Sequence, residues 1–360
     1  MRVVISGYYG FENIGDEAIL KSIIIALKEE FEDIEITVLS NNPIETKKSH
    51  NVNSINRWNF FNIYKELKLS SGLISGGGSL LQDVTSSRSI AYYTFIIGLA
   101  KFANKPVFVY AQGIGPINKT INRKITKHFL NKVEYISLRD IESSHLIKSI
   151  GVNKSFEIVP DPVMGLDFRF SGKFNIDEEY IIISVRDWKS KTNYLKQIAD
   201  ACNYFLDKDI KIKLLPMHGK EDEKTSKKLS DMINGNVEIL THDMNINQQI
   251  NYIKNAKIMI GMRLHALIFA GNLGIPMIGI SYDPKIDSYL KLVDQPCIGN
   301  IDDGIDSEEL VQKTLHIFSN YENIKEELEN TTSKLKSTAK LTARKAINTF
   351  KTHKANLEKK

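Results

Sequence analysis

The chain is poor in cysteine and has no long apolar run. Its 360 residues include only 2 cysteines, Cys202 and Cys297, and neither has a CxxC or metal-type neighbour. A disulfide framework is therefore excluded, and this cysteine usage is typical of a reducing compartment. The most apolar helical segment, residues 90–103, is too short and too rich in tyrosine to span a bilayer. No basic and apolar leader precedes the first expected strand, so we expect a cytoplasmic protein.

Widespread catalytic signatures are also missing. The sequence has no DxD-like or HExxH-like metal pattern and no GxSxG nucleophile elbow. The glycines at 7, 10 and 15 do not match the GxGxxG dinucleotide fingerprint, and the glycine run at 76–78 lacks the Walker lysine. We therefore expect no metal and no redox cofactor.

The charge balance is mildly basic. Lysine and arginine number 48 against 43 acidic residues, for a formal charge of +5. This excess suits an anionic small-molecule substrate but is too small for a nucleic-acid-binding protein. The hydrophobic content of 42% is ordinary for a globular chain.

Short β-branched runs alternate with amphipathic segments along the chain. The expected strands are 3–6, 34–39, 72–74, 106–111, 135–138, 157–159, 180–185, 210–215, 237–240, 257–260 and 277–280. Apolar strands separated by helices indicate parallel sheets covered on both faces, and an irregular stretch at Gly165–Phe174 separates two such series. We predict an α/β fold of two doubly wound Rossmann-like domains facing across a cleft, over residues 1–168 and 176–322.

A basic segment follows, over residues 323–360. Its apolar residues between Ile324 and Leu357 recur at helical spacing, which predicts an amphipathic helix docked on one domain or crossing between both. Its lysines have two interpretations. They form either a solvated helix face or a surface that holds the protein near anionic lipids.

The most unusual loop is GMRLH, at 261–265 between a strand and a helix. Ligands of such sheets bind beyond the carboxyl ends of the strands, where helix N–H groups are exposed. Here Arg263 would bind a phosphate or carboxylate, and His265 would donate or accept a proton. The plainer interpretation is an arginine–carboxylate pair beside a capping histidine.

Two glycine-containing loops follow strands of the first half. The loop Gly7–Glu17 contains Asn13 and ends in Asp16 and Glu17, which either bind and deprotonate sugar hydroxyls or merely complement a helix dipole. In the second loop, Gly77, Gly78 and Ser79 leave room for a ligand at backbone N–H groups, with Gln82 as a polar contact. The alternative is a turn that close packing requires.

Further charged residues end other strands. Arg186 would bind an anion beside Arg263, and Lys285 would add a cation. Arg139 and His218 are also candidate substrate ligands. For each arginine, a salt bridge to the next residue, Asp140 or Asp187, is the structural alternative.

Together these motifs resemble one family. GYYGFENIGDEAIL, GGGSLLQD, AQGIGP, SLRD, SVR and GMRLHALIFAGNLGIPMIGISYDPKI follow one another as in the polysaccharide pyruvyltransferases, and most closely as in the CsaB branch, which modifies secondary cell-wall polysaccharide. The resemblance runs from Met1 to about residue 320 and implies a GT-B-like fold.

The resemblance also implies an activity. Pyruvate would pass from phosphoenolpyruvate to two hydroxyls of a sugar, forming a cyclic ketal and releasing phosphate. In the CsaB branch the acceptor would be an N-acetylmannosamine residue of a lipid-linked precursor, and the ketal would anchor surface-layer proteins. Arg263, Leu264 and His265 match the motif associated with phosphoenolpyruvate, and Arg186 matches a second donor arginine.

Two other functions are open to this sequence. A GT-B glycosyltransferase that uses a nucleotide sugar would share the architecture, although an acidic ribose ligand would be expected where Arg-Leu-His stands. A carbohydrate-binding or wall-assembly protein without catalysis is the third.

Overall fold

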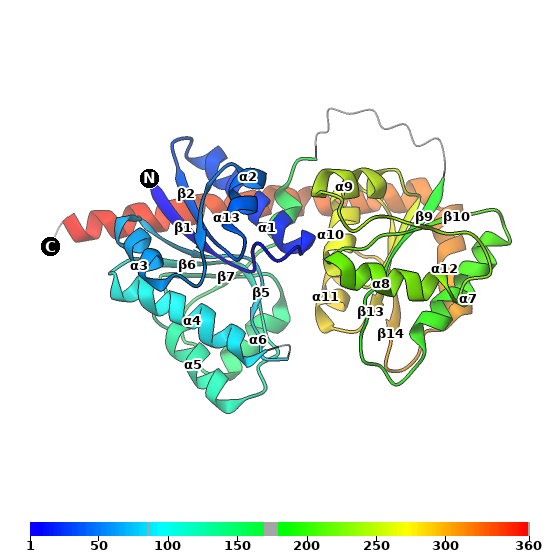
Figure 1. Cartoon of the computed structure of the whole chain (residues 1–360), viewed down its shortest axis with the longest axis horizontal. Helices are drawn as coiled ribbons and strands as arrows, with labels where there is room; N and C mark the ends of the chain where they lie inside the picture. Colours follow the sequence, from blue (N-terminus) through cyan, green and yellow to red (C-terminus); the bar gives the residue numbers. More distant parts are fainter. Residues whose placement is uncertain (85, 169–178, 359–360) are drawn as a thin grey trace. The chain divides into compact units, whose positions relative to one another are not determined.

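The protein is described by a computed structural model covering residues 1–84, 86–168 and 179–358. The described chain forms two compact units, one of residues 1–166 with 335–360 and one of residues 167–334 (Figure 1). The expected irregular stretch from 169 onward and the expected boundary at 176 lie outside the described residues.

The first unit is built on a parallel sheet with the strand order β3-β2-β1-β4-β6-β7-β8, and β5 pairs with β6. Its strands are β1 (Arg2–Ser6), β2 (Glu35–Ser40), β3 (Asn53–Asn56), β4 (Gly72–Ser75), β5 (Gly78–Leu81), β6 (Val107–Ile114), β7 (Tyr135–Leu138) and β8 (Glu157–Ile158). Its helices are α1 (Ile14–Glu30), α2 (Pro43–His50), α3 (Phe60–Leu69), α4 (Ser87–Phe102), α5 (Thr120–Leu130) and α6 (Ile141–Ser149), with a 3₁₀ turn at Pro162–Gly165.

The second unit repeats this plan with the strand order β11-β10-β9-β12-β13-β14, again parallel. Its strands are β9 (Tyr180–Ser184), β10 (Lys211–Leu214), β11 (Glu238–Ile239), β12 (Ile258–Gly261), β13 (Met277–Ser281) and β14 (Cys297–Asn300). Its helices are α7 (Tyr194–Leu206), α8 (Gly219–Ser230), α9 (Ile246–Lys254), α10 (Leu264–Leu273), α11 (Pro284–Leu292) and α12 (Ser307–Ser319).

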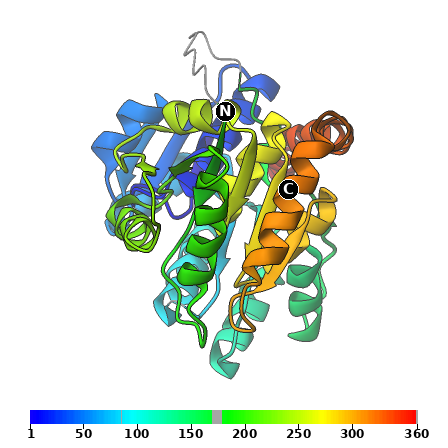
Figure 2. The ribbon, with the colours of Figure 1, turned by 90° about the vertical axis from the view of Figure 1, so that its right-hand side faces the viewer.

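Helices cover both faces of this second sheet. Helix α7 packs with α8 and α12, whereas α10 packs with α9 and α11. Figure 2 shows helices on both sides of the strands. The central strands are consequently buried along their whole length, and β9, β12 and β13 consist almost entirely of apolar residues and glycine. The predicted fold class, an α/β fold with two Rossmann-like parallel sheets, is confirmed.

The expected strands are all present, but three more were not predicted. The strand β3 reads Asn-Ser-Ile-Asn and lies at a sheet edge, and β14 contains Gly299 in a left-handed conformation. The third, β5, begins inside the glycine run that was predicted to be a loop, because Gly78 pairs with Gln112 of β6.

The basic segment at the end of the chain is one helix, α13 (Tyr321–Glu358). Its last turns belong to the first unit, where Ala343, Ala346 and Phe350 are buried. Its basic residues are not merely solvated. Lys340 pairs with Glu29 (3.2 Å), Arg344 with Glu30 (3.0 Å), and Lys345 with Glu157.

The side chain of Leu357, at the end of the predicted stripe, lies outside the described residues. In the part of the chain that is described, no helix combines the length and the apolar character needed to cross a membrane.

Candidate functional site

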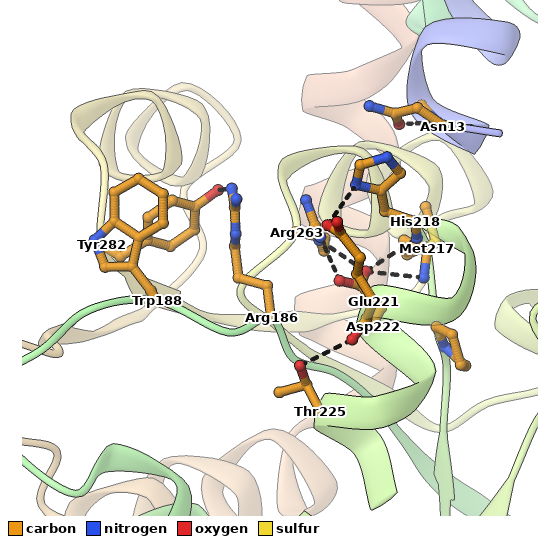
Figure 3. Close-up of polar contacts among 12 residues, drawn as sticks. Asn13, Arg186, Trp188, Met217, His218, Glu221, Asp222, Thr225, Arg263 and Tyr282 are labelled. Atoms are coloured by element: carbon orange, nitrogen blue, oxygen red, sulfur yellow. Dashed lines mark hydrogen bonds and ion pairs between the residues drawn. The ribbon is translucent and has the colours of Figure 1, made fainter. Parts of the chain in front are cut away.

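The register of the second sheet brings the predicted donor residues together. Ser184 of β9 pairs with Gly261 of β12, and Arg186 and Arg263 each follow two residues later. The neighbouring strand β10 leads to His218 through Pro216 and Met217. Two arginines and a histidine therefore leave adjacent parallel strands at the same edge of one sheet (Figure 3).

Arg263 is held by a carboxylate that the sequence did not reveal. Its Nε donates to Oδ2 of Asp222 (2.8 Å) and its Nη2 donates to Oδ1. The Asp222 side chain is only 1% exposed, and its Oδ2 also accepts from the backbone N–H groups of Met217 (3.1 Å) and His218 (3.0 Å). This is the arginine–carboxylate pair that the sequence offered as the plainer interpretation. The pair uses only the Nε–Nη2 edge of the guanidinium, so Nη1 remains available for a ligand.

Arg186 is positioned by aromatic rings instead of an acid. Its guanidinium lies 4.7 Å from the ring centre of Trp188 and 4.8 Å from that of Tyr282, and its Nη1 donates to the Tyr282 hydroxyl (2.7 Å). The alternative partner, Asp187, binds Lys228 instead (2.8 Å). Among the described residues no carboxylate lies within ion-pair distance of Arg186, so its positive charge is uncompensated.

Two further predicted residues lie at the same sheet edge. The pKa of His218 is lowered, first by burial and then by the positive charge of Arg263, although Asp222 opposes the shift. A neutral imidazole is therefore favoured there. Lys285 binds Asp283 (2.9 Å), the residue that caps α11, and its charge is largely balanced.

Leu264 and His265 form the first turn of α10. Arg263 is the N-cap residue, Leu264 is buried, and His265 is half-buried. The guanidinium of Arg263 and the first-turn N–H groups, at the positive end of the helix dipole, therefore both place positive charge at this end of α10.

The space beside the glycine run of the first unit is occupied by the protein's own side chains. A Cβ on Gly76 would lie 2.3 Å from the Tyr9 hydroxyl, one on Gly77 2.9 Å from Ile19, and one on Gly78 2.8 Å from Asp16. Burial, followed by the charge of Asp16, raises the pKa of Tyr9 well above its ordinary value. Close packing is thus one reason for these glycines, and ligand binding at Gly77 and Gly78 stays a prediction.

Glu17 is engaged within its own loop. Its Oε1 accepts from the backbone N–H of Gly10 (2.7 Å), and its Oε2 lies 2.8 Å from Nε2 of the buried His50. Asn13 caps α1 by accepting from the N–H of Gly15 (3.1 Å). The roles predicted for Asn13, Asp16 and Glu17 in binding a sugar remain predictions.

Arg139 forms its main salt bridge with a distant residue. Its Nη1 donates to Asp161 (2.8 Å), whereas Asp140, the partner expected from the sequence, lies 3.9 Å away. Burial alone would lower the pKa of Arg139, but Asp161 and Asp140 outweigh it and the pKa is raised. Arg139 also donates to Oγ of Ser79 (3.1 Å), which links two predicted ligands. Oε1 of the third, Gln82, accepts from the N–H of Val84 (2.9 Å).

Residues with a structural role at these sites were missed. Asp222 stands four residues after His218, Trp188 two residues after Arg186, and Tyr282 three residues before Lys285. Nothing in the sequence shows which arginine each of them contacts. Arg57 gave no signal at all, although it is buried against Tyr92 (4.1 Å to the ring centre) and donates to the carbonyl of Gly7 (3.2 Å). Within the described ranges, no group of three or more His, Cys, Asp or Glu side chains is arranged to hold a metal ion.

Comparison with protein families assigns the chain. The family model described as polysaccharide pyruvyl transferase matches residues 13–284, which is more than half of the sequence and includes Arg186, Arg263 and His265. The chain belongs to the polysaccharide pyruvyl transferase family. The Amylovoran biosynthesis protein AmsJ of Erwinia amylovora is 20% identical over 401 residues, covering 91% of this chain and 94% of AmsJ.

Solved structures show the same fold at low identity. The UDP-GlcNAc 2-epimerase of Neisseria meningitidis has a TM-score of 0.65 at 10% identity, covering 97% of this chain and 100% of its own. Anabaena HepE in complex with UDP and glucose has a TM-score of 0.67 at 10% identity, covering 98% and 100%. A glycosyltransferase from Rickettsia africae has a TM-score of 0.66 at 12% identity, covering 98% of each chain. These likenesses show a GT-B fold and nothing more specific.

Membership of the polysaccharide pyruvyl transferase family makes the chain a transferase that pyruvylates polysaccharide. The family assignment specifies neither the CsaB branch nor the donor and acceptor.

Proposed function

We propose that the chain transfers pyruvate from phosphoenolpyruvate to two hydroxyls of an N-acetylmannosamine residue in a lipid-linked secondary cell-wall precursor. The products are a cyclic pyruvyl ketal and inorganic phosphate. Each ketal adds one carboxylate to the polymer, a negative ligand for anchoring surface-layer proteins. This places the enzyme in the cytoplasm, at the inner face of the membrane, where such precursors are built.

The uncompensated charge of Arg186 is the observation that supports the donor. Phosphoenolpyruvate carries a phosphate and a carboxylate, so its binding requires more than one fixed cation. Among the described residues Arg186 has no acid within ion-pair distance, and Arg263 offers the edge that Asp222 leaves unused. The first turn of α10 adds a third positive element, and Lys285 and His218 lie at the same sheet edge.

The chemistry follows from a proton donor beside these cations. His265 protonates the methylene carbon of the donor, which converts the double bond into an oxocarbenium-like centre at the adjacent carbon. One sugar hydroxyl forms a bond to that carbon and loses its proton. The C–O bond to phosphate then breaks and phosphate leaves with its electron pair. The second hydroxyl adds to the same carbon and loses its proton, which closes the ketal. No redox or metal cofactor takes part in this scheme.

The first unit supplies the acceptor side of the proposal. Asp16 and Glu17 are the candidate bases for the attacking hydroxyls, and Asn13, Ser79, Gln82 and Arg139 are candidate sugar ligands. The pairing of Glu17 with His50 would keep its carboxylate in one orientation for this role.

The deciding experiment measures phosphate release from phosphoenolpyruvate with and without a lipid-linked N-acetylmannosaminyl-N-acetylglucosamine acceptor. We expect acceptor-dependent release and a product whose mass has gained one pyruvyl ketal. Arg186→Ala should weaken donor binding at least about tenfold, since a hydrogen bond to a charged group contributes about 1.5–3 kcal/mol. Lys224→Ala, which removes an exposed cation from the same unit, is the matched control.

The outcomes are distinguishable. Turnover with another amino-sugar acceptor would retain the reaction and reject the acceptor. Binding of a uridine nucleotide in place of phosphoenolpyruvate would favour a GT-B glycosyltransferase, and folded protein with neither binding nor turnover would favour a carbohydrate-binding role.

A further inference from the structure

An aromatic surface covers α3 and α4 of the first unit. Trp58, Phe61 and Phe102 are 56%, 78% and 76% exposed, and Phe60, Leu69 and Phe95 are exposed beside them. So many large apolar side chains on two neighbouring helices are unusual for a surface that faces only water. We name these six residues the aromatic face.

Ring contacts join residues 58–64 to α4 beside this face. Phe60 lies 5.0 Å from Phe95, Trp58 lies 5.1 Å from Tyr92, and Tyr64 lies 5.7 Å from Phe102. In these pairs, a residue later in the segment 58–64 contacts a residue later in α4. The two helices therefore run parallel. Helix α5 packs on the other side of α4, and all three lie side by side in Figure 1.

The chain around this face is basic and almost free of acids. Residues 84–133 contain no aspartate or glutamate, although Asp83 and Glu134 flank them and Glu134 pairs with Lys101 (2.6 Å). The other basic residues of this range are Arg88, Lys105, Lys119, Arg123, Lys124, Lys127 and Lys132. In α3, Lys65 and Lys68 are exposed, and Lys68 lies over the Tyr64 ring. The only acid of that helix, Glu66, is half-buried and accepts from the hydroxyl of Thr37 (3.4 Å).

We infer that the aromatic face docks the protein on an anionic lipid bilayer. Aromatic side chains flanked by lysines are the composition that binds the headgroup and acyl boundary, and each lysine near an anionic surface adds attraction. Charge decides between the possible occupants, because a second copy of this chain would bring an equally basic face and repel it. The inference depends neither on the donor nor on the acceptor proposed above.

Ion pairs make α13 a weaker candidate for this contact than α3 and α4. Lys340, Arg344 and Lys345 of that helix are paired with Glu29, Glu30 and Glu157, so much of its charge is already balanced. The lysines of α3 have no acidic partner among the described residues. We therefore propose the membrane contact at α3 and α4, and the contact predicted for the C-terminal helix stays a prediction.

Vesicle co-sedimentation of the full chain tests this inference. We expect binding to vesicles of phosphatidylcholine with phosphatidylglycerol, and little to phosphatidylcholine alone. Phe61→Ser/Phe102→Ser and Lys65→Glu/Lys68→Glu should each weaken the partition coefficient about tenfold or more. Matched controls are Ile44→Ser/Leu292→Ser and Lys208→Glu/Lys227→Glu, which alter as many exposed apolar or basic side chains elsewhere.

Fluorescence gives a second readout that does not require a variant of the face. The chain has 2 tryptophans, so Trp188→Phe leaves Trp58 as the reporter. Anionic vesicles should shift its emission to the blue, and brominated lipid should quench it. Equal binding by face and control variants, or unshifted emission, would overturn the inference. So would a dimer that Phe61→Ser/Phe102→Ser dissociates in the absence of vesicle binding, since the face would then bind a second copy.

Discussion

Arg263 and Arg186 are held in opposite ways, and this sets the charge of the candidate donor site. Arg263 forms a buried pair with Asp222, whereas Arg186 lies between two aromatic rings. The acid fixes the direction of a guanidinium at the cost of its net charge. The rings fix the direction and leave the charge in place, so an arriving anion interacts most strongly with Arg186.

Asp222→Ala tests the buried pair. Removing the acid leaves Arg263 without its partner in a largely buried position, which should lower the free energy of unfolding by about 3–5 kcal/mol. Donor binding should weaken as well, because Arg263 loses its orientation. Thermal unfolding and calorimetric titration with phosphoenolpyruvate measure the two effects.

Asp187→Ala is the control for this change. It breaks the exposed pair with Lys228, which should cost less than about 1 kcal/mol. Similar losses for the two variants would show that Asp222 has no special part in holding Arg263.

His218 gives a pH dependence whose sign follows from its burial. Because its folded-state pKa lies below the ordinary 6.5, the unfolded chain binds a proton that the folded chain does not. Stability should therefore fall as the pH drops through 6.5, until the lowered pKa is reached. His218→Gln should show a smaller loss of stability between about pH 7.5 and about pH 5.5 in urea unfolding.

His316→Gln replaces an exposed histidine of α12 and serves as the reference for this experiment. If both variants kept the wild-type dependence on pH, some other group would be responsible for it.

At the scale of elements, periodicity predicted the strands with apolar runs and failed for β3, β5 and β14, each of which contains only one or two aliphatic residues. The strand β3 is polar because it lies at a sheet edge, and β14, at the edge of the other sheet, contains Gly299 with a positive φ. The partner of Arg263 stands 41 residues earlier and that of Arg139 stands 22 residues later. A lone sequence contains no signal for such pairs, although both arginines were identified as unusual.

An aromatic contact with β4 is one of the interactions that hold the end of α13. A Cβ on Gly72 would lie 2.4 Å from Cε1 of Phe350, so the ring packs directly on the strand's backbone. Phe350→Ala should cost about 3–5 kcal/mol of stability, and Gly72→Ala should also destabilise by displacing the ring. Thr352→Ala, on the exposed side of the same turn, should change the urea midpoint little. A Phe350 variant as stable as this control would mean that the helix end is not docked.

At the scale of the molecule, both cysteines lie in the second unit. The rate at which their thiols are labelled therefore measures the unfolding of that unit alone. Burial raises the pKa of Cys202 to about 12 and also raises that of Cys297, so both thiols should react slowly in the native state. Phosphoenolpyruvate at about 100 times its Kd should slow their labelling in moderate urea about 100-fold, because a ligand stabilises only the folded unit.

Arg186→Ala should reduce this protection to about tenfold or less, while Lys224→Ala retains it. If phosphoenolpyruvate left the labelling rates unchanged, the donor would not bind to the second unit, even if the enzyme still turned over.

The first unit is discontinuous, since residues 167–334 separate its two parts. A ribosome therefore delivers the whole second unit before it delivers Phe350. Throughout that interval the backbone of Gly72 lacks its aromatic cover, and the acids Glu29, Glu30 and Glu157 lack their basic partners. The nascent first unit must wait, incomplete, for a closing helix that is synthesised last.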